Sequence, residues 1–449
     1  MDGILSPIEE RLDEPSAKGL AHAVSQAIRD GLLSPGTRLP PIREVAHELA
    51  LSPTTVSAAW ALLRRSGMIH TDGRRGTKVA RTDVSVTGRY QTVLERQAPF
   101  ELDLSAGGPD PALLPSLSRA IAGLDRAGAQ GSYLDQPDLP ELVEVLGNDW
   151  PYRPENLTMV DGAMDAMQMI VHACLRFGDR VVVEHPAFTQ LLDLLETAGV
   201  RIIGVPLDDE GVRLDELRAA FRTPVAAVFL QPRAQNPTGV SLSQRRARAI
   251  AKVVRGTSTV VVEDDSSGMI SLSEPTSLGR WLPDQTLHIR SFSKSHGPDI
   301  RLAALSAPAG LLEQVTARRQ LGQGWSSRLL QRILLNLLTD PASIREVSAA
   351  RTEHARRRTA IVTALHEHGV RVGGCDGMNI WVPVHDESAA IMRLASQGIC
   401  VTPGAPFAVL PDNAPHIRVT SGLIKDHHAE LAERLAVAAR TDGRRSRGR

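Results

Sequence analysis

The sequence predicts an α/β protein in two parts. A small helical unit with a β tail is followed by a large domain in which helices cover both faces of a mostly parallel sheet. The chain has 449 residues, which exceeds one ordinary domain and suits a small domain joined to a large one. Residues 18–80 carry apolar side chains at helical spacing, and from about residue 101 β-branched runs alternate with helical segments.

Charge is balanced over the whole chain but not locally. The sequence has 51 Lys and Arg against 51 Asp and Glu. Between Lys18 and Arg81, however, ten basic residues stand against four acids, a net charge of +6. A local excess of this kind indicates a surface for a polyanion, whereas the overall balance excludes a chain that is basic throughout.

The cysteines and the N-terminal residues indicate a reducing compartment. Cys174, Cys375 and Cys400 lie far apart without the spacing of metal ligands, and their odd number argues against a disulfide framework. Residues 1–15 are acidic and lack the apolar core of a signal peptide, and no run approaches eighteen apolar residues. We therefore expect a cytoplasmic protein with no metal site and no membrane partner.

Residues 15–81 are predicted to form helices followed by a β hairpin. Residues 17–33 and 41–50 have helical spacing, and a third helix begins at Ser52, a good N-cap, with Pro53 in its first position. Gly67 fits just past the end of this helix, before two short strands around a Gly-Arg-Arg-Gly turn. The predicted inner faces are Ile42, Val45, Ala46 and Leu49 in the second helix, and Val56, Ala59, Trp60 and Leu63 in the third.

Two helices joined by a short turn, then a hairpin with a basic tip, form the pattern of a winged helix-turn-helix. In that arrangement the second helix enters the DNA major groove and the hairpin tip lies on the backbone. Hydroxyls and arginines are the groups expected at phosphates. The candidate DNA contacts are Arg43, Thr54, Thr55, Ser57, Arg64, Arg65, Arg74, Arg75 and Lys78. The pattern alone leaves open a protein-interaction module with a solvated basic face.

Residues 31–80 resemble the GntR-type DNA-binding domain along nearly their whole length. The resemblance rests on the "L.PG.RLP..RE.A..L" run, the "TTV..A...L...G" helix and the glycine-bounded wing. It implies binding to double-stranded operator DNA. One position departs from the pattern, because Pro53 stands where the family often has arginine.

The large domain is predicted at residues 101–440, after a linker at 82–100. The β-branched runs fall at 180–185, 226–232, 259–264 and 286–294, and helical patterns such as 191–199 and 243–256 separate them. Its large part is expected at about 115–305. Longer helices and two further strand-like stretches suggest a smaller α/β C-terminal part at about 330–440, before a basic, disordered tail at 441–449.

Four separated pieces of this domain suggest a cofactor pocket: "QNPTG" at 235–239, "VVEDD" at 261–265, Lys294 among small polar residues, and Arg301. A pyridoxal-phosphate site needs a lysine amine for the aldehyde, a carboxylate for the pyridine nitrogen, a donor for the phenolate oxygen and a cradle for the phosphate. Each piece alone is weak, since "NPTG" also forms turns and lysines usually lie on the surface. Their combination is specific.

In order and spacing, residues 101–440 resemble the class I/II aminotransferases, which are fold-type I pyridoxal-phosphate enzymes. The resemblance runs through "DLSAGGPDPALLP", "VEHPAFTQLL", "QNPTG", "VVEDD", "SFSKSHGPDIRL" and "HIRVTSG". It implies that Lys294 carries the cofactor as a Schiff base. Asp264 would face the pyridine nitrogen and Asn236 the phenolate oxygen, with Phe188 stacked on the ring.

The same resemblance indicates which residues would bind the phosphate and the carboxylate of the ligand. The phosphate would lie against Gly162, Ala163, Ser291, Ser293 and Arg301. Tyr133 would reach the phosphate of a partner subunit, because pockets in the family are shared across a homodimer. Arg418 would pair with the carboxylate of a substrate or effector, for which a guanidinium fork is well suited.

Three positions depart from the family pattern. Ser266 stands where a tyrosine commonly meets the phenolate oxygen, and no other nearby tyrosine is expected to replace it. Asp138 stands where glycine is usual, and Asp161 where serine or threonine is common beside the phosphate. These changes weaken the case for efficient transamination more than the case for binding the cofactor.

A GntR-type winged helix, a linker and an aminotransferase-like domain together resemble the MocR branch of the GntR-family transcriptional regulators. This implies a homodimeric, pyridoxal-phosphate-dependent regulator that senses an amine or amino acid by external aldimine formation at Lys294. Two winged helices would then contact two half-sites. The alternatives are an aminotransferase that carries an appended DNA-binding domain, and a regulator whose large domain no longer binds the cofactor.

Overall fold

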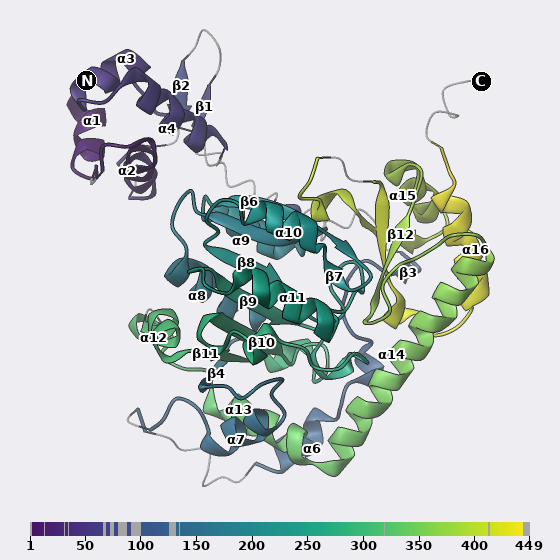
Figure 1. Ribbon diagram of the computed structural model, residues 1–449. Coiled ribbons are helices and arrows are strands. Elements are labelled where there is room, and N and C mark those ends of the chain that lie inside the picture. Colours follow the sequence, from purple (N-terminus) through teal and green to yellow (C-terminus); the bar gives the residue numbers. More distant parts are fainter. Residues whose placement is uncertain are drawn as a thin grey trace. The chain divides into compact units, whose positions relative to one another are not determined.

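The computed structural model, drawn in Figure 1, covers most of the chain. It describes residues 2–12, 14–30, 32–34, 36–65, 69–71, 76–79, 88–90, 100–124, 132–133, 135–317, 319–411 and 414–442. Several predictions therefore lie outside the described residues: Gly67, the hairpin tip with Arg74 and Arg75, the side chain of Arg65, most of the linker, and the tail from residue 443. No helix in the described part of the chain is both long and apolar enough to span a membrane.

The chain divides into two compact units, each described by itself. The smaller consists of residues 1–88 with the short segments 175–179 and 193–201, and the larger of the remaining residues. The N-terminal elements of the smaller unit are α1 (Asp2–Glu9), α2 (Ala17–Arg29), α3 (Ile42–Glu48), α4 (Pro53–Arg65), β1 (Ile69–Thr71) and β2 (Thr77–Val79). The two strands are antiparallel, which completes a winged helix-turn-helix.

The predicted start of α4 and the predicted inner faces of α3 and α4 are present. The Oγ of Ser52 accepts a hydrogen bond from the backbone N–H of Thr55 at 3.0 Å, as expected of an N-cap. The predicted inner stripe of α4 is buried. Of the four residues in the stripe predicted for the second helix, only Ile42 is partly exposed. Helix α1 was not predicted. Its Ile8 is fully buried in the core of the unit, so an apolar face is present within an acidic stretch.

An eight-stranded sheet forms the centre of the larger unit. Its order is β4-β11-β10-β9-β8-β5-β6-β7, and the pairs β5/β8, β8/β9 and β9/β10 are parallel. The strands are β4 (Asn156–Val160), β5 (Arg180–His185), β6 (Arg201–Asp208), β7 (Gly211–Val212), β8 (Ala227–Leu230), β9 (Val260–Asp265), β10 (Thr286–Ser291) and β11 (Ala303–Ala307). The first predicted run coincides with β5, and the other three overlap β8, β9 and β10.

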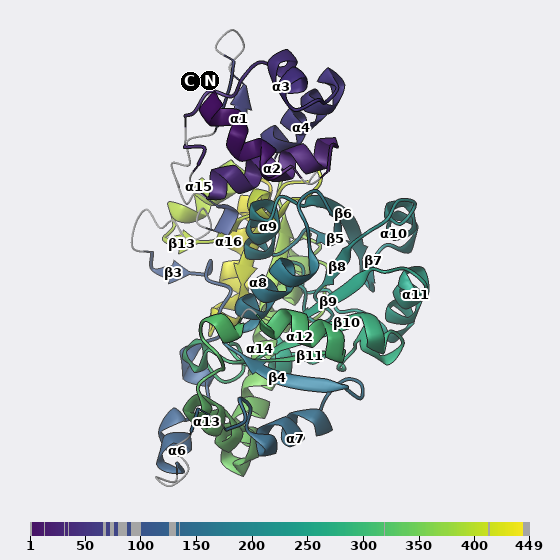
Figure 2. The ribbon, with the colours of Figure 1, turned by 90° about the vertical axis from the view of Figure 1, so that its left-hand side faces the viewer.

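Helices cover both faces of this sheet. The helices that follow its strands are α8 (Ala163–Cys174), α9 (Thr189–Thr197), α10 (Leu214–Ala220), α11 (Gln244–Val254) and α12 (Ala309–Ala317). Figure 2 shows α10 and α11 on one side of the sheet and α8 on the other. One core joins α10 and α11 to alternate residues of β5, β8 and β9, among them Val182, Val228 and Val261.

The C-terminal part has its own core and a three-stranded antiparallel sheet in the order β12-β15-β14. Two helices precede the large sheet in the chain, α6 (Leu117–Ala122) and α7 (Pro140–Asn148). The elements that follow it are α13 (Arg328–Thr339), α14 (Pro341–Glu367), β12 (Asn379–Pro383), α15 (Glu387–Ala395), β14 (Thr402–Pro403), β15 (His416–Thr420) and α16 (His428–Ala439). Strand β3 (Leu102–Asp103) pairs in parallel with β13 (Ile399–Cys400). The start of the large domain thus belongs structurally to its C-terminal part.

Candidate functional site

A cavity of about 280 Å³ lies in the larger unit beside the carboxyl ends of the parallel strands. Open α/β sheets bind ligands at this edge, because the turns after neighbouring strands meet there. Ten of the eleven residues predicted for the cofactor and its ligand line the cavity: Gly162, Ala163, Phe188, Asn236, Asp264, Ser291, Ser293, Lys294, Arg301 and Arg418. The exception is Tyr133.

Lys294 lies in the turn that follows β10, and its side chain enters the cavity. The Nζ donates a hydrogen bond to the Oγ of Ser266 at 3.3 Å. Burial lowers the pKa of the Lys294 ammonium, an effect that the carboxylate of Asp264 opposes. A lowered pKa increases the fraction of neutral amine, which is the form that attacks an aldehyde.

Asp264 lies in β9 with only 5% of its surface exposed. Its Oδ2 accepts a hydrogen bond from Nε2 of Gln231 at 2.7 Å, while its Oδ1 is buried and has no partner among the described residues. Burial raises the pKa of Asp264, and the bond from Gln231 opposes the rise. A buried oxygen without a donor is costly, so the site is suited to a ligand that brings a positively charged N–H group. A protonated pyridine nitrogen fits this requirement.

Gln231, which stands in none of the sequence motifs, connects three residues of the site. Its Nε2 also approaches the Oγ of Ser266 at 3.4 Å, and its Oε1 accepts from the backbone N–H of Asn236 at 2.8 Å. Its own backbone N–H donates to Glu184 at 3.1 Å. The available signal was its place directly after β8, at the same sheet edge as Lys294.

The predicted phosphate cradle is built where β4 turns into α8. Gly162 has a φ of +104°, which favours glycine, and α8 begins at Ala163. The first N–H groups of a helix are unpaired within the helix and suit an anion. The guanidinium of Arg301 lies across this turn, with its Nη2 at 3.5 Å from the carbonyl of Asp161.

Asp161 and Asp138, the two acids that depart from the family pattern, have hydrogen-bond partners within the fold. The Oδ2 of Asp161 accepts from Nη2 of buried Arg319 at 2.6 Å, which compensates its charge beside the cradle. Asp138 accepts from the Oγ1 of Thr158 at 2.7 Å and from the N–H of Met159 at 2.8 Å. Both acids therefore serve contacts within the fold.

Arg418 lies on β15 and is almost fully buried. It donates to the Oδ1 of Asn236 at 3.2 Å, to the Oγ1 of Thr402 at 3.1 Å and to the carbonyl of Ser105. Burial lowers its pKa to about 10, and interaction with Tyr90 opposes the decrease. Its Nε is buried and has no hydrogen-bond partner within the described part of the chain.

Two tyrosines have different positions relative to the cavity. Tyr133 is 89% exposed, packs edge-on against Trp325 with ring centroids 5.7 Å apart, and does not line the cavity of its own chain. Its role toward a partner subunit stays a prediction. Tyr90 does line the cavity. The fold therefore brings a tyrosine of the linker to the cavity, while the expectation that no tyrosine replaces the usual one at the phenolate oxygen stays a prediction.

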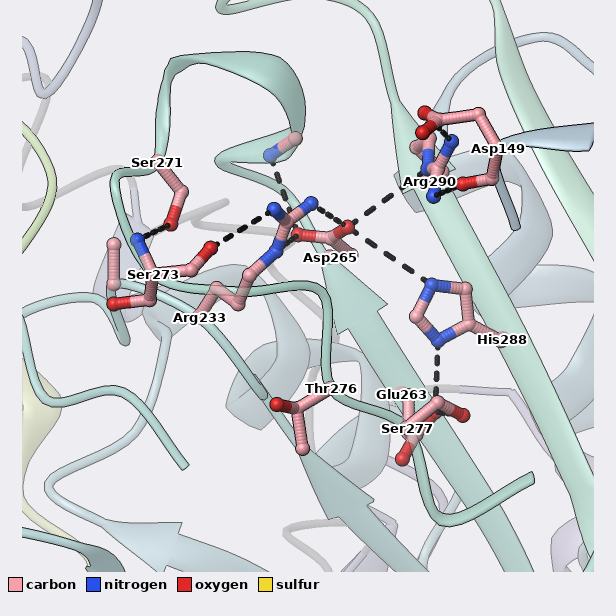
Figure 3. A network of polar contacts seen from close by, with 12 residues as sticks. Asp149, Arg233, Glu263, Asp265, Ser271, Ser273, Thr276, Ser277, His288 and Arg290 are labelled. Carbon is pink, nitrogen blue, oxygen red and sulfur yellow. Dashed lines mark hydrogen bonds and ion pairs between the residues drawn. The ribbon is translucent and has the colours of Figure 1, made fainter. Parts of the chain in front are cut away.

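Behind Asp264, a buried polar network supports the ends of β9 and β10. Figure 3 shows Arg233, His288 and Arg290 pointing toward Asp265, and His288 also toward Glu263. Nδ1 of His288 lies 2.7 Å from Glu263, and Arg233 pairs with Asp265 through two nitrogens. Burial would raise the pKa of Asp265, but Arg233 holds it below its usual value. The network fixes the strand that carries Asp264.

The described DNA-contact candidates gather on α3, α4 and the hairpin. Arg43, Thr54, Ser57 and Arg64 are exposed, while Thr55 and Lys78 are partly buried. The Oγ1 of Thr55 lies 2.7 Å from the Oγ of Ser52, so its hydroxyl also belongs to the capping turn. Arg65, Arg74 and Arg75 cannot be placed beside them, since these side chains lie outside the described residues.

Comparison with protein families supports both parts of the chain. Residues 101–435 match "Aminotransferase class I and II", and residues 16–79 match "Bacterial regulatory proteins, gntR family". The chain is 35% identical over 431 residues to the vitamin B6 salvage pathway transcriptional repressor PtsJ of Salmonella typhimurium, covering 92% of this chain and 96% of that protein. It is 26% identical to the HTH-type transcriptional regulator TauR of Rhodobacter capsulatus, covering 89% and 92%.

Solved structures show the same fold for the large domain. The multiple substrate aminotransferase of Thermococcus profundus has a TM-score of 0.70 at 21% identity, covering 78% of this chain and 93% of that chain. The kynurenine aminotransferase of Pyrococcus horikoshii has a TM-score of 0.70 at 22% identity, covering 78% and 92%. At this level of identity the similarity establishes the fold alone.

Proposed function

Given that this chain belongs to the MocR branch of the GntR-family transcriptional regulators, with an aminotransferase class I and II domain, we propose that it binds pyridoxal phosphate and senses an amine or amino acid. One observation carries the proposal. Lys294, Arg418 and the unpartnered Oδ1 of Asp264 share one cavity in a chain that also has a winged helix. Pyridoxal phosphate supplies an aldehyde that takes up primary amines reversibly.

Each side of the cavity has a defined task in this proposal. Lys294 is the attachment point, and Asp264 keeps the proton on the pyridine nitrogen. Asn236 meets the phenolate oxygen beside Arg418, to which it is already bonded. Gly162, Ala163, Ser291, Ser293 and Arg301 hold the phosphate through N–H, hydroxyl and guanidinium donors.

The same geometry favours sensing over turnover. The hydroxyl of Ser266 is held by Lys294 and Gln231, on a side chain too short to cover the position of the usual tyrosine. An aminotransferase with an appended DNA-binding domain remains the competing function. Rapid conversion of the bound cofactor to its amine form by an amino acid would favour that enzyme.

DNA binding is the proposed output. The exposed arginines and hydroxyls of α3 and α4 would contact the operator, and a homodimer would present two winged helices to two half-sites. Tyr133, exposed on its own subunit, would complete the phosphate site of the partner subunit. A ligand changes DNA binding only by its difference in affinity between the two arrangements of the protein.

A second candidate is that a vitamin B6 compound is itself the sensed ligand. The observation that favours it is the near full-length similarity to a regulator named for the vitamin B6 salvage pathway. In that case Lys294 would respond to the supply of the aldehyde, and no amine would be required. The two candidates use the same cavity and predict different responses.

The experiment compares the wild-type protein with Lys294→Ala on DNA from upstream of its own gene. We expect the wild type to show the absorbance of lysine-bound cofactor and to change its DNA affinity by a factor of about 5–150 with ligand, the usual range of allosteric coupling. Lys294→Ala should lose the absorbance and the response. Lys252→Ala, an exposed lysine on α11, is the control and should retain both.

The response also separates the two candidates. Pyridoxal phosphate added alone to cofactor-free protein should change DNA affinity if the vitamer is the signal, and amines should be needed if it is not. A wild-type protein that purifies without cofactor absorbance and takes up none would contradict both candidates.

A further inference from the structure

Part of the linker takes part in the wall of the cavity. Tyr90 lines it together with Lys294 and Arg418. Electrostatic interaction with Tyr90 raises the pKa of Arg418 against the effect of burial, so the two side chains of the cavity wall lie within electrostatic range of each other. Residue 90 follows the predicted DNA-binding domain in the chain and precedes every other residue of the cavity wall.

Its neighbour Arg89 is tied to the loop beside Arg418. The Nη1 of Arg89 donates to the carbonyl of Pro406 at 3.2 Å and to that of Ala408 at 2.7 Å. Between these two carbonyls lies Phe407, whose ring supports the guanidinium of Arg418 at 5.2 Å from its centroid. The linker is therefore hydrogen-bonded, through Arg89, to the same short loop that contacts Arg418.

This loop is also linked to the strand that precedes Phe188. The backbone N–H of Ala187 donates to the carbonyl of Phe407 at 3.0 Å, and the N–H of Val409 donates to Nδ1 of His185 at 3.2 Å. Movement of the loop would thus displace both Phe188, which is predicted to stack on the cofactor ring, and Arg418, which is predicted to bind the carboxylate.

We propose that Tyr90 contacts the carboxylate of the bound ligand beside Arg418, and that Arg89 passes this contact to the segment leading to the winged helix. The proposal rests on the function proposed above and names the ligand as an aminocarboxylate. The phenol would donate its O–H to the carboxylate, as a second donor to a group already paired with Arg418. Because Arg89 and Tyr90 belong to the linker that follows the winged helix in the chain, the contact would couple ligand binding to DNA binding.

The first test is Tyr90→Phe, which removes the hydroxyl and keeps the ring. Its probes are L-alanine, which has a carboxylate, and ethylamine, which has none, both titrated against the absorbance of the bound cofactor. We expect the affinity for L-alanine to fall at least about tenfold, the loss of one hydrogen bond to a charged group, while the affinity for ethylamine changes less than about twofold. Equal losses for both probes, or no loss for L-alanine, would overturn the carboxylate contact.

The second test is Arg89→Met, which keeps the length of the side chain and removes its donors. The measured quantity is the ratio of DNA affinities with and without saturating L-alanine, taken for each variant against its own ligand-free value. We expect the ratio to approach one in Arg89→Met. Arg245→Met, which removes an exposed guanidinium paired with Glu210, is the control and should retain the wild-type ratio.

Failure of this inference differs from failure of the proposed function. If the wild type shows no change in DNA affinity with L-alanine or any amine, the proposed sensing of an amine or amino acid fails. If the wild type shows the change and Arg89→Met keeps the full ratio, only the coupling through residue 89 is refuted. Cofactor absorbance in both variants verifies that the site is folded.

Discussion

At the scale of single residues, the chemistry of the cavity depends on which polar groups are left without partners. Asp264 has one satisfied oxygen and one that is not, and Arg418 has two satisfied terminal nitrogens and a buried Nε that is not. Because a buried polar atom without a partner costs on the order of 1–3 kcal/mol, a ligand that supplies the partner binds more tightly. The two groups lie at the places where the pyridine nitrogen and the carboxylate are proposed to bind.

The sequence predicted these residues because each stands in a local motif. Lys294, Asp264 and Asn236 are surrounded by residues that match the family pattern, so their place in the cavity could be expected. Gln231 and Tyr90 stand in no such motif, and the place of Gln231 directly after β8 indicates only the edge of the sheet at which it lies. The role of Gln231 follows from its contacts to Asp264 and Asn236, and the place of Tyr90 follows from the hydrogen bonds of its neighbour Arg89 to the loop of Phe407.

Glu184 provides a prediction of pH dependence. It is buried near Asp264, and burial raises its pKa to about 8, so it is protonated in the folded protein where it would be ionised in the unfolded chain. Between pH 4.5 and about 8 the native state therefore binds the additional proton, and the free energy of unfolding falls as pH rises. Glu184→Gln mimics the protonated acid and should remove this fall, which is on the order of 5 kcal/mol over the range at about 1.4 kcal/mol for each pKa unit.

The measurement is urea unfolding of both proteins at pH 5.5 and pH 8. The stability of Glu184→Gln relative to wild type should increase with pH, because only the wild type has to hold a proton. Exposed Glu216 on α10 offers a matched control, since Glu216→Gln should show no such trend. A constant difference between Glu184→Gln and wild type at the two pH values would refute the assignment.

At the scale of elements, the central strands were predictable and the outer strands were not. Strand β5 has the bounds that the β-branched run gave, because a buried parallel strand is apolar on both faces. Strands β4 and β11 lie at one edge of the sheet and are antiparallel to each other, with sequences richer in small and polar residues. Their place in the sheet follows from pairing with other strands, and the local sequence pattern gives no information about that pairing. The pairing of β3 with β13, far apart in sequence, is a second case.

The start of α4 allows a cap to be separated from a DNA contact. The Oγ of Ser52 caps the helix through the N–H of Thr55, whereas Ser57 is exposed on the first turns and is a candidate for phosphate contact. Ser52→Ala should lower the local stability of α4 by about 1 kcal/mol, the usual loss at an N-cap, and speed amide exchange there about fivefold. Ser57→Ala should leave this exchange unchanged and weaken binding to operator DNA.

Hydrogen–deuterium exchange of the full chain gives the first quantity, and a binding titration at fixed salt gives the second. If Ser57→Ala accelerates exchange in α4 as strongly as Ser52→Ala, then Ser57 supports the helix and its assignment to DNA is wrong. Binding by Ser57→Ala at wild-type affinity would remove the residue from the interface.

At the scale of the whole molecule, the joining of two domains carries the functional conclusion. A winged helix alone indicates DNA binding, and an aminotransferase fold alone indicates a cofactor, but neither indicates regulation by a ligand. The family matches on both sides of the linker, and a relative that covers nearly the whole chain, make the chain a transcriptional regulator. The sequence could predict this because the two motif sets are independent. It could not predict how the domains communicate, since that depends on contacts such as those of Arg89.

The proposed homodimer gives the last prediction, which concerns a site shared by two subunits. Tyr133 lies outside the cavity of its own chain and is almost fully exposed, so its hydroxyl is free to serve the phosphate of a partner subunit. Tyr133→Phe and Lys294→Ala should each lack a tight cofactor site. In a mixed dimer, one site carries both defects and the other carries neither. Mixing the two variants should therefore restore tight, lysine-bound cofactor, detected by its absorbance, in proportion to the mixed dimers formed. Separately tagged subunits verify the exchange, and exchange without restored absorbance would show that Tyr133 does not act across the dimer.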